Sequence, residues 1–123
     1  MRKDTIKLNP SEGKVNGKFQ IINFWEGDFF ILYIPSLQMS SYGKDEKEAH
    51  LMMRETLQDF FESLNIKKGT DLFYKTMREL GWSRDRYFKK KLSVDLSDTT
   101  YDDIKKEFNL PDDVELSTAE MAV

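Results

Sequence analysis

The clearest structural signal in this chain lies in residues 24–49, which read FWEGDFFILYIPSLQMSSYGKDEKEA. Two apolar segments flank Glu26-Gly27-Asp28, a tripeptide typical of a tight turn because glycine accepts the positive φ that other residues resist. Pro35 lacks an N–H and is expected to end the second strand. A third, more polar strand is predicted over residues 37–42, at an edge of the sheet. The stretch therefore predicts three strands that lead into a helix.

That helix is predicted from Glu46 to Asn65. At about 100° per residue its apolar side chains fall on one broad arc, so this face is expected to pack on the sheet. Asp45 and Glu48 have the spacing of a capping box, in which each carboxylate accepts a hydrogen bond from a backbone N–H. The carboxylates gathered here are therefore interpreted as a helix start.

The segments on either side of this unit carry weaker signals. Upstream, Asn16-Gly17 is a turn signature that predicts a short hairpin from Val15 into Phe19, and residues 18–25 alternate as a strand does. Beyond residue 116 the tail is expected to form a helical turn or to be disordered. Between these limits the patterns predict a helix, a strand, a second helix and a last short strand, over residues 70–81, 87–96, 100–109 and 114–116.

Together these elements predict an α+β fold. Its centre is an antiparallel β-sheet with a β-β-β-α core packed by the long helix, and a C-terminal helix-strand-helix region is added to it. The 123 residues match one domain and can bury a core without a disulfide or a metal. Lys67-Lys68-Gly69 divides residues 1–66 from residues 67–123, and the second part either shares the core of the first or stands apart.

The composition argues against catalysis. The chain has one His and no Cys, which removes thiolate nucleophiles and zinc–thiolate sites. It also lacks a phosphate-binding glycine loop and a nucleophile elbow. We therefore expect a non-enzymatic protein with no catalytic, cofactor or metal site. The longest apolar run, residues 29–34, is too short to span a bilayer, and the N-terminus has no apolar leader, so a cytoplasmic protein without a membrane partner is expected.

Charge is unevenly distributed along the chain. Residues 1–94 hold 17 Lys/Arg and 13 Asp/Glu, a net charge of +4, whereas residues 95–123 hold two Lys and nine Asp/Glu, a net charge of −7. The acidic part is interpreted either as a solvated surface or as a docking surface for a basic partner.

A basic cluster supplies the candidate nucleic-acid-binding residues Arg86, Lys89, Lys91 and Ser93. Basic side chains here alternate with Tyr87 and Phe88, a mixture that can grip phosphates. The alternative is an edge strand that charges protect from aggregation.

The same region is similar to a known DNA-binding motif. Residues 90–98 and 101–108 resemble the ribbon and first helix of ribbon-helix-helix repressors, which implies a homo-oligomeric DNA-binding transcriptional regulator. That interpretation requires Leu92, Val94 and Leu96 to stay out of the core of the chain.

Residues 19–65 resemble the HicB-like antitoxin domain. The shared features are an aromatic strand, the Glu26-Gly27-Asp28 turn, Pro35-Ser36-Leu37, and Gly43-x-x-x-x-Glu48-Ala49 at the start of a long helix. Met39-Ser40 replaces the Gly-Cys typical of the family. The resemblance implies a partial RNase H-like fold without catalytic residues, and a function in binding another protein, a small basic mRNA-cleaving toxin. Many members add a C-terminal DNA-binding module, which the region after Ile66 does not clearly match.

Overall fold

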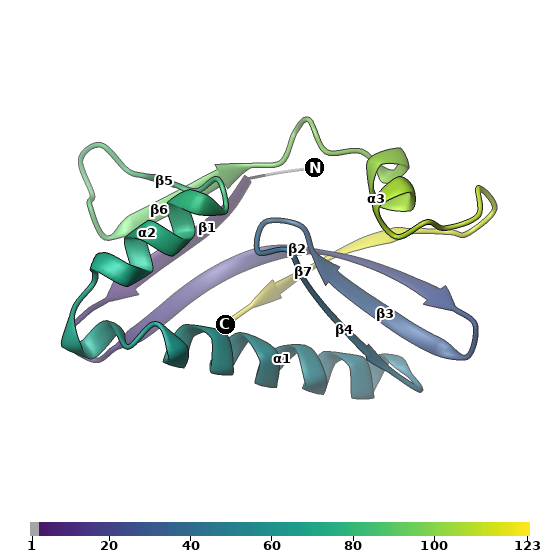
Figure 1. Ribbon diagram of the computed structural model, residues 1–123, viewed down its shortest axis with the longest axis horizontal. Helices are drawn as coiled ribbons and strands as arrows, with labels where there is room; N and C mark the ends of the chain where they lie inside the picture. Colours follow the sequence, from purple (N-terminus) through teal and green to yellow (C-terminus); the bar gives the residue numbers. More distant parts are fainter. Residues whose placement is uncertain (1–2) are drawn as a thin grey trace.

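The computed structural model describes residues 3–123 and shows one antiparallel sheet with three α-helices (Figure 1). The α+β class predicted from the sequence is confirmed. In chain order the elements are β1 (Lys3–Asn9), β2 (Lys14–Glu26), β3 (Phe29–Ile34), β4 (Met39–Gly43), α1 (Glu46–Ser63), the 3-10 helix η1 (Ile66–Lys68), α2 (Asp71–Glu79), β5 (Ser83–Arg84), β6 (Lys91–Asp95), α3 (Tyr101–Glu107) and β7 (Ser117–Ala122).

The sheet is built around the long strand β2, which pairs with three other strands. Lys18 of β2 pairs with Thr5 of β1 and with Ala122 of β7, so β1 and β7 lie on opposite sides of β2. Further along, Ile22 pairs with both β3 and β7. Strands β1 and β3 therefore follow one another along the same side of β2. Strand β4 extends the sheet from β3 and forms an edge, and β6 followed by β5 extends it from β1.

A buried carboxylate fills the break between β1 and β3. Asp4 is fully buried, and its Oδ1 accepts a hydrogen bond of 2.9 Å from the backbone N–H of Gln20. Its Oδ2 accepts one of 2.5 Å from Ser36 Oγ, just beyond the end of β3. The carbonyl of Ser36 in turn accepts 2.9 Å from Trp82 Nε1. Asp4 thus provides an acceptor for the N–H of Gln20 in β2, at a point that neither β1 nor β3 reaches.

The predicted β-β-β-α unit is confirmed, although the third strand begins at Met39 and not at residue 37, and the helix ends at Ser63 and not at Asn65. Gly27 has φ of 59° in the turn between β2 and β3, and β3 ends at the residue before Pro35. Asp45 caps α1, its Oδ1 accepting 2.8 Å from the N–H of Glu48. A capping box with both hydrogen bonds forms instead at α3, between Thr100 and Asp103.

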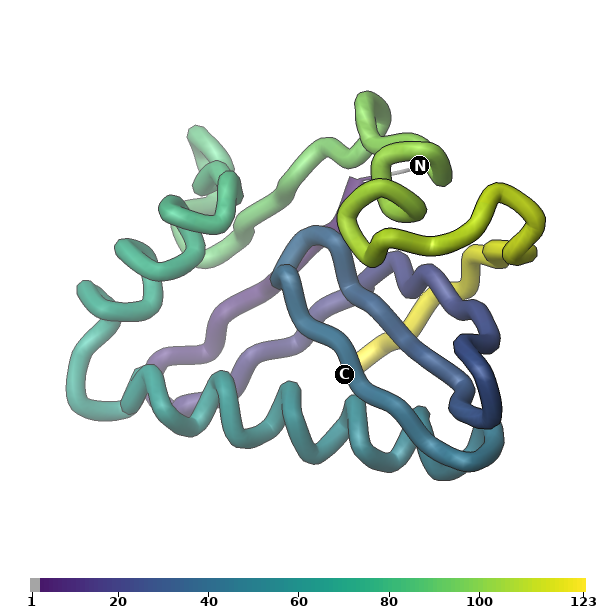
Figure 2. Tube along the Cα trace, turned by 45° about the vertical axis from the view of Figure 1, so that its right-hand side comes forward, coloured from purple at the N-terminus to yellow at the C-terminus, as the bar shows by residue number. Residues whose placement is uncertain are grey.

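Several predictions outside this unit are wrong. Asn16-Gly17 makes no hairpin, because β2 runs straight through it and the turn lies at Pro10–Gly13, where Gly13 N–H donates to the Pro10 carbonyl. The strand predicted over residues 87–96 begins only at Lys91. The tail is neither helical nor disordered, since residues 117–122 form β7 beside β2, as the yellow end of the tube in Figure 2 shows.

The two faces of the sheet carry separate apolar clusters. Alternate residues of β2 point to opposite faces, so Phe19 and Ile21 join the cluster beneath α1 and α2, whereas Ile22 and Phe24 join that beneath α3. We call the face beneath α3 the outer face. Residues from both sides of Lys67 share the larger cluster, and β6 and β7 pair with β1 and β2. The region after residue 67 therefore belongs to the same core and sheet.

The burial of β6 contradicts the geometry of an intermolecular ribbon. Along its whole length β6 pairs with β1 of its own chain. Leu92 and Leu96 are buried, and Val94 packs against the core. This strand is therefore not free to pair with a second copy in the way that a ribbon-helix-helix dimer requires.

Candidate functional site

Helix α3 covers the middle of the outer face. Phe108 packs edge-on against Phe24 and Tyr33, with ring centroids 5.5 and 4.7 Å apart. Tyr33 Oη donates 2.9 Å to Glu107 Oε1, and burial, followed by this hydrogen bond and the Glu107 charge, raises the pKa of Tyr33 far above its ordinary value. Because α3 is short, the outer face stays open at both ends.

At one open end four lysines form what we call the lysine face: Lys3, Lys7, Lys18 and Lys91. They come from β1, β2 and β6, and all four side chains are exposed. Lys7 pairs directly with Lys91, and Thr5 pairs with both Lys18 and Ser93. A hollow of about 570 Å³ lies among them. Strand register thus gathers cations from segments more than seventy residues apart.

The chain neutralises the lysine face only in part, because the Asp85 carboxylate lines the same hollow and Lys91 and Lys89 contribute to its lowered pKa. Among the described residues one ion pair falls within 4.0 Å, Lys14 with Glu12 at 3.9 Å, and it includes none of the four lysines. Asp95 stands opposite Lys3 at the border, where the N–H of Ser97 and, more weakly, Lys3 hold its pKa below the ordinary value. The lysine face therefore carries an excess of positive charge.

The loop between β5 and β6 borders this face. The Asp85 carboxylate accepts hydrogen bonds of 2.8 Å from the N–H groups of Phe88 and Tyr87, which lower its pKa and fix the loop. Tyr87 and Phe88 nevertheless remain 80% and 62% exposed. Lys91 Nζ lies 4.8 Å from the Phe88 ring centroid, and a second hollow of about 450 Å³ lies there. Aromatic and cationic groups thus meet at one end of the sheet.

The four predicted nucleic-acid-binding residues fall in two places. Lys91 and Ser93 lie on the outer side of β6, within the lining of the larger hollow, and Arg86 and Lys89 are exposed in the adjoining loop. Sequence reasoning missed Lys3, Lys7 and Lys18. Their signal was the alternation of polar and apolar residues in 3–8 and 14–19, which predicts one polar face on each strand.

The other open end of the outer face carries exposed aromatic side chains. Phe29 and Tyr42 are 44% and 61% exposed, and their rings stack edge-on with centroids 5.5 Å apart. Ile31 lies beside them, opposite Tyr42 and half-buried. We call these three residues the aromatic edge, because Tyr42 belongs to the edge strand β4.

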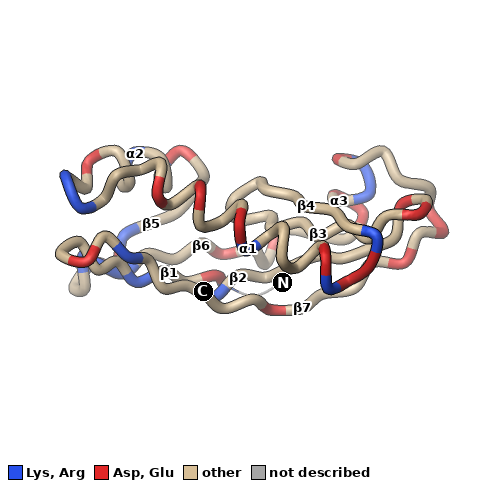
Figure 3. The backbone as a smooth tube through the Cα atoms, turned by 90° about the horizontal axis from the view of Figure 1, so that it is seen from below, with Lys and Arg blue, Asp and Glu red and all other residues tan. Residues whose placement is uncertain are grey.

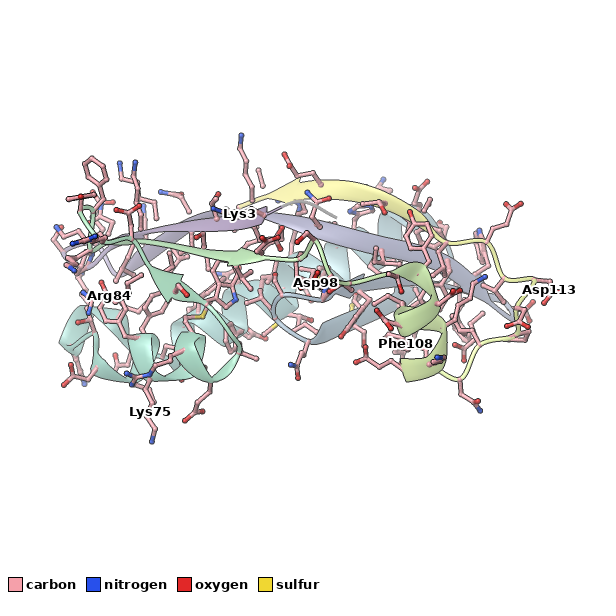
Figure 4. The ribbon with its side chains drawn as sticks, turned by 90° about the horizontal axis from the view of Figure 1, so that it is seen from above. Lys3, Lys75, Arg84, Asp98, Phe108 and Asp113 are labelled. Atoms are coloured by element: carbon pink, nitrogen blue, oxygen red, sulfur yellow. The ribbon has the colours of Figure 1, made fainter. Side chains whose placement is uncertain are left out.

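Two carboxylates border the aromatic edge. Glu26 pairs with Phe29 across β2 and β3, and Asp28 follows in the turn. Figure 3 shows several red segments, with some blue ones among them, at the end of the molecule that carries α3, and blue segments beside β1 and β5. In Figure 4 the labelled Arg84 and Asp113 stand at opposite ends of the sheet. The outer face is therefore cationic at one end and acidic and aromatic at the other.

The other carboxylates whose pKa is shifted have structural roles. Hydrogen bonds from backbone N–H groups lower the pKa of Asp103, as they do for Asp85 and Asp95, and burial raises that of Asp4. Over residues 3–123 no three His, Cys, Asp or Glu side chains are grouped so that they could hold a metal ion.

None of the helices within residues 3–123 combines the length and the apolarity of a membrane-spanning helix. Comparison of the chain with protein-family models, with curated proteins and with solved structures found no match.

Proposed function

We propose that this chain is a non-enzymatic binding protein whose aromatic edge docks a second protein with a basic surface. The observation that carries the proposal is the adjacent pair Phe29 and Tyr42, exposed where α3 leaves the sheet uncovered. Large rigid aromatic side chains are enriched among the residues that dominate protein–protein binding energy. Such a pair beside an edge strand is therefore a suitable anchor for a partner.

Electrostatics favour a basic partner. The segment 95–123, with its net charge of −7, folds as α3, a loop and β7, and its loop residues Val114 and Leu116 pack on the cluster beneath α3. Exposed carboxylates around an apolar centre raise the association rate with a basic protein and disfavour acidic ones. The resemblance of residues 19–65 to HicB-like antitoxin domains implies a partner of this kind, a small basic toxin.

Strand β4 offers a second mode of contact. It is the last strand of the sheet beyond β3, so the backbone groups on its outer side are available to an added strand. Strand addition of this kind supplies affinity through main-chain hydrogen bonds, while side chains such as Tyr42 supply specificity.

The test is titration calorimetry against the product of a neighbouring reading frame that encodes a short basic protein. The variant Phe29→Ser/Tyr42→Ser should weaken binding about a thousandfold, because each aromatic anchor contributes about 2 kcal/mol. The matched control is Tyr87→Ser/Phe88→Ser, which removes two aromatics that are at least as exposed, at the other end of the sheet. Equal losses of affinity in both variants would argue against the aromatic edge. If sedimentation velocity showed that the wild type dimerises and that Phe29→Ser/Tyr42→Ser does not, the partner would be a second copy of the chain.

A further inference from the structure

The lysine face has an electrostatic cost within the isolated chain. Lys7 and Lys91 stand directly opposite each other on neighbouring strands, and like charges in that position destabilise a sheet. Over residues 3–123 no carboxylate lies within 4.0 Å of either ammonium group. A bound anion between them would relieve the repulsion, so the arrangement favours an anionic ligand.

The shape of the surface favours an extended ligand. The two hollows share Lys7 and Lys91, and together they run from Ala122 of β7 to Phe88 in the loop. Three interstrand steps of about 4.8 Å separate β7 from β6, which gives a path of about 15 Å. Asn16, Thr5 and Ser93 place hydrogen-bonding side chains along it.

The bordering loop favours a single strand over a duplex. Phe88 and Tyr87 present exposed rings, and the Asp85 hydrogen bonds hold their backbone in place, so little ordering is needed on binding. Arg84 anchors the same loop to α2, its guanidinium lying 3.6 Å from the Tyr74 ring centroid. Unpaired bases can stack on such rings, whereas bases within a duplex are already stacked.

We infer that the lysine face binds single-stranded nucleic acid. Lys18, Lys7 and Lys91 contact phosphates along the path, Lys3 contacts a phosphate beside it on β1, and Phe88 stacks on a base at the end of the path. Because the Lys91 ammonium lies beside the Phe88 ring, a base stacked on Phe88 would have its phosphate close to Lys91. This surface lies at the opposite end of the outer face from the aromatic edge, so it acts independently of the protein-binding function proposed above.

Fluorescence anisotropy with labelled oligo(dT) and oligo(U) of about twelve nucleotides tests the inference. With four phosphates neutralised, the plot of log affinity against log salt should have a slope of about −2.8. Lys7→Gln/Lys91→Gln removes two of the four phosphate contacts, so it should halve that slope. At about 0.1 M salt each lost contact lowers the binding constant by about 0.7 log units, so the double variant should bind about 25-fold more weakly. Phe88→Ala should weaken binding at least about fivefold.

The matched controls carry the same chemical changes elsewhere. Lys44→Gln/Lys47→Gln removes two exposed charges near the start of α1, and Tyr42→Ala removes an exposed aromatic ring from the aromatic edge. Both controls should keep wild-type affinity. Circular dichroism of each variant separates lost binding from lost folding.

Three outcomes would overturn the inference. If Lys44→Gln/Lys47→Gln weakened oligonucleotide binding as much as Lys7→Gln/Lys91→Gln, the attraction would depend on the net charge of the chain and not on the lysine face. Tighter binding to the matching duplex than to the single strand would exclude stacking on Phe88. The third outcome is that neither oligonucleotide binds, whereas anionic phospholipid vesicles bind the wild type and not Lys7→Gln/Lys91→Gln. It would assign the lysine face to a membrane surface instead.

Discussion

Asp4→Asn and Asp4→Ala should separate the hydrogen-bonding role of the buried carboxylate from its charge. Alanine removes both acceptors and leaves the N–H of Gln20 buried without a partner between β1 and β3. Each such buried group costs about 1–3 kcal/mol, so we expect a loss of about 3 kcal/mol in the free energy of unfolding, or about 10 °C in Tm. Asparagine can accept from Gln20 through Oδ1 and donate to Ser36 Oγ, so it should stay within about 1 kcal/mol of the wild type at neutral pH.

The pH dependence supplies a second measure of the same site. Burial raises the pKa of Asp4 above its ordinary value of 3.8, although the hydrogen bonds from Ser36 and Gln20 oppose this shift. The Asp4 carboxyl therefore binds its proton more tightly in the folded chain than in the unfolded chain. The free energy of unfolding consequently falls as pH rises from 3.8 through the pKa of Asp4 in the folded chain. Asparagine does not titrate, and its stability relative to the wild type should therefore improve with rising pH.

Urea unfolding followed by tryptophan fluorescence measures both effects. Trp82 is buried and hydrogen-bonded to Ser36, whereas Trp25 is largely exposed, so a Trp25→Phe background isolates the signal of Trp82. If Asp4→Asn were as destabilising as Asp4→Ala at neutral pH, the site would require the charge and the hydrogen-bonding explanation would fail. Parallel pH profiles of Asp4→Asn and the wild type would refute the raised pKa.

Three further perturbations test other parts of the structure. A Cβ on Gly43 would lie 2.5 Å from the backbone nitrogen of Ala49, so Gly43→Ala should cost about 1–3 kcal/mol in urea unfolding, and an unchanged midpoint would contradict this close packing of β4 and α1. Deletion of residues 117–123 removes β7 and should abolish hydrogen-exchange protection along the side of β2 that it covers; retained protection would show that β7 is not required there. Lys7→Gln/Lys91→Gln removes a pair of like charges that stand opposite each other, so it should raise the free energy of unfolding by about 0.2–1 kcal/mol, measured as an increase in Tm. A lower Tm would mean that the two ammonium groups do not repel each other in the folded chain.

The β2–β3–β4–α1 unit was predictable because its boundaries depend on neighbouring residues. Gly27 supplies the positive φ of the turn, Pro35 cannot continue a ladder, and Asp45 binds an N–H only three residues ahead. These preferences act over a few bonds and need no knowledge of the rest of the fold.

The same local reasoning failed where tertiary contacts override a local preference. Asn16-Gly17 has turn chemistry, yet β1 pairs with both residues on one side of β2, and Val123, which follows β7, exchanges backbone hydrogen bonds with Gly17 on the other side. These contacts hold the segment extended. Gly17 is needed there for space, since a Cβ would come within 2.8 Å of the Phe19 ring and 3.0 Å of the Thr5 carbonyl oxygen. The tail at 117–122 shows no strong strand pattern, and its conformation comes from the free side of β2.

The chain alone thus established the class of fold, the central hairpins, the helix start and the acidic bias of residues 95–123. Tertiary structure established which strands are neighbours, and with that the lysine face and the uncovered aromatic edge. The physical reason is distance along the chain. Alternation assigns Lys7 and Lys91 each to the polar face of a strand, but whether those faces meet depends on a pairing that buries Ile6 and Leu92, 86 residues apart, in one core.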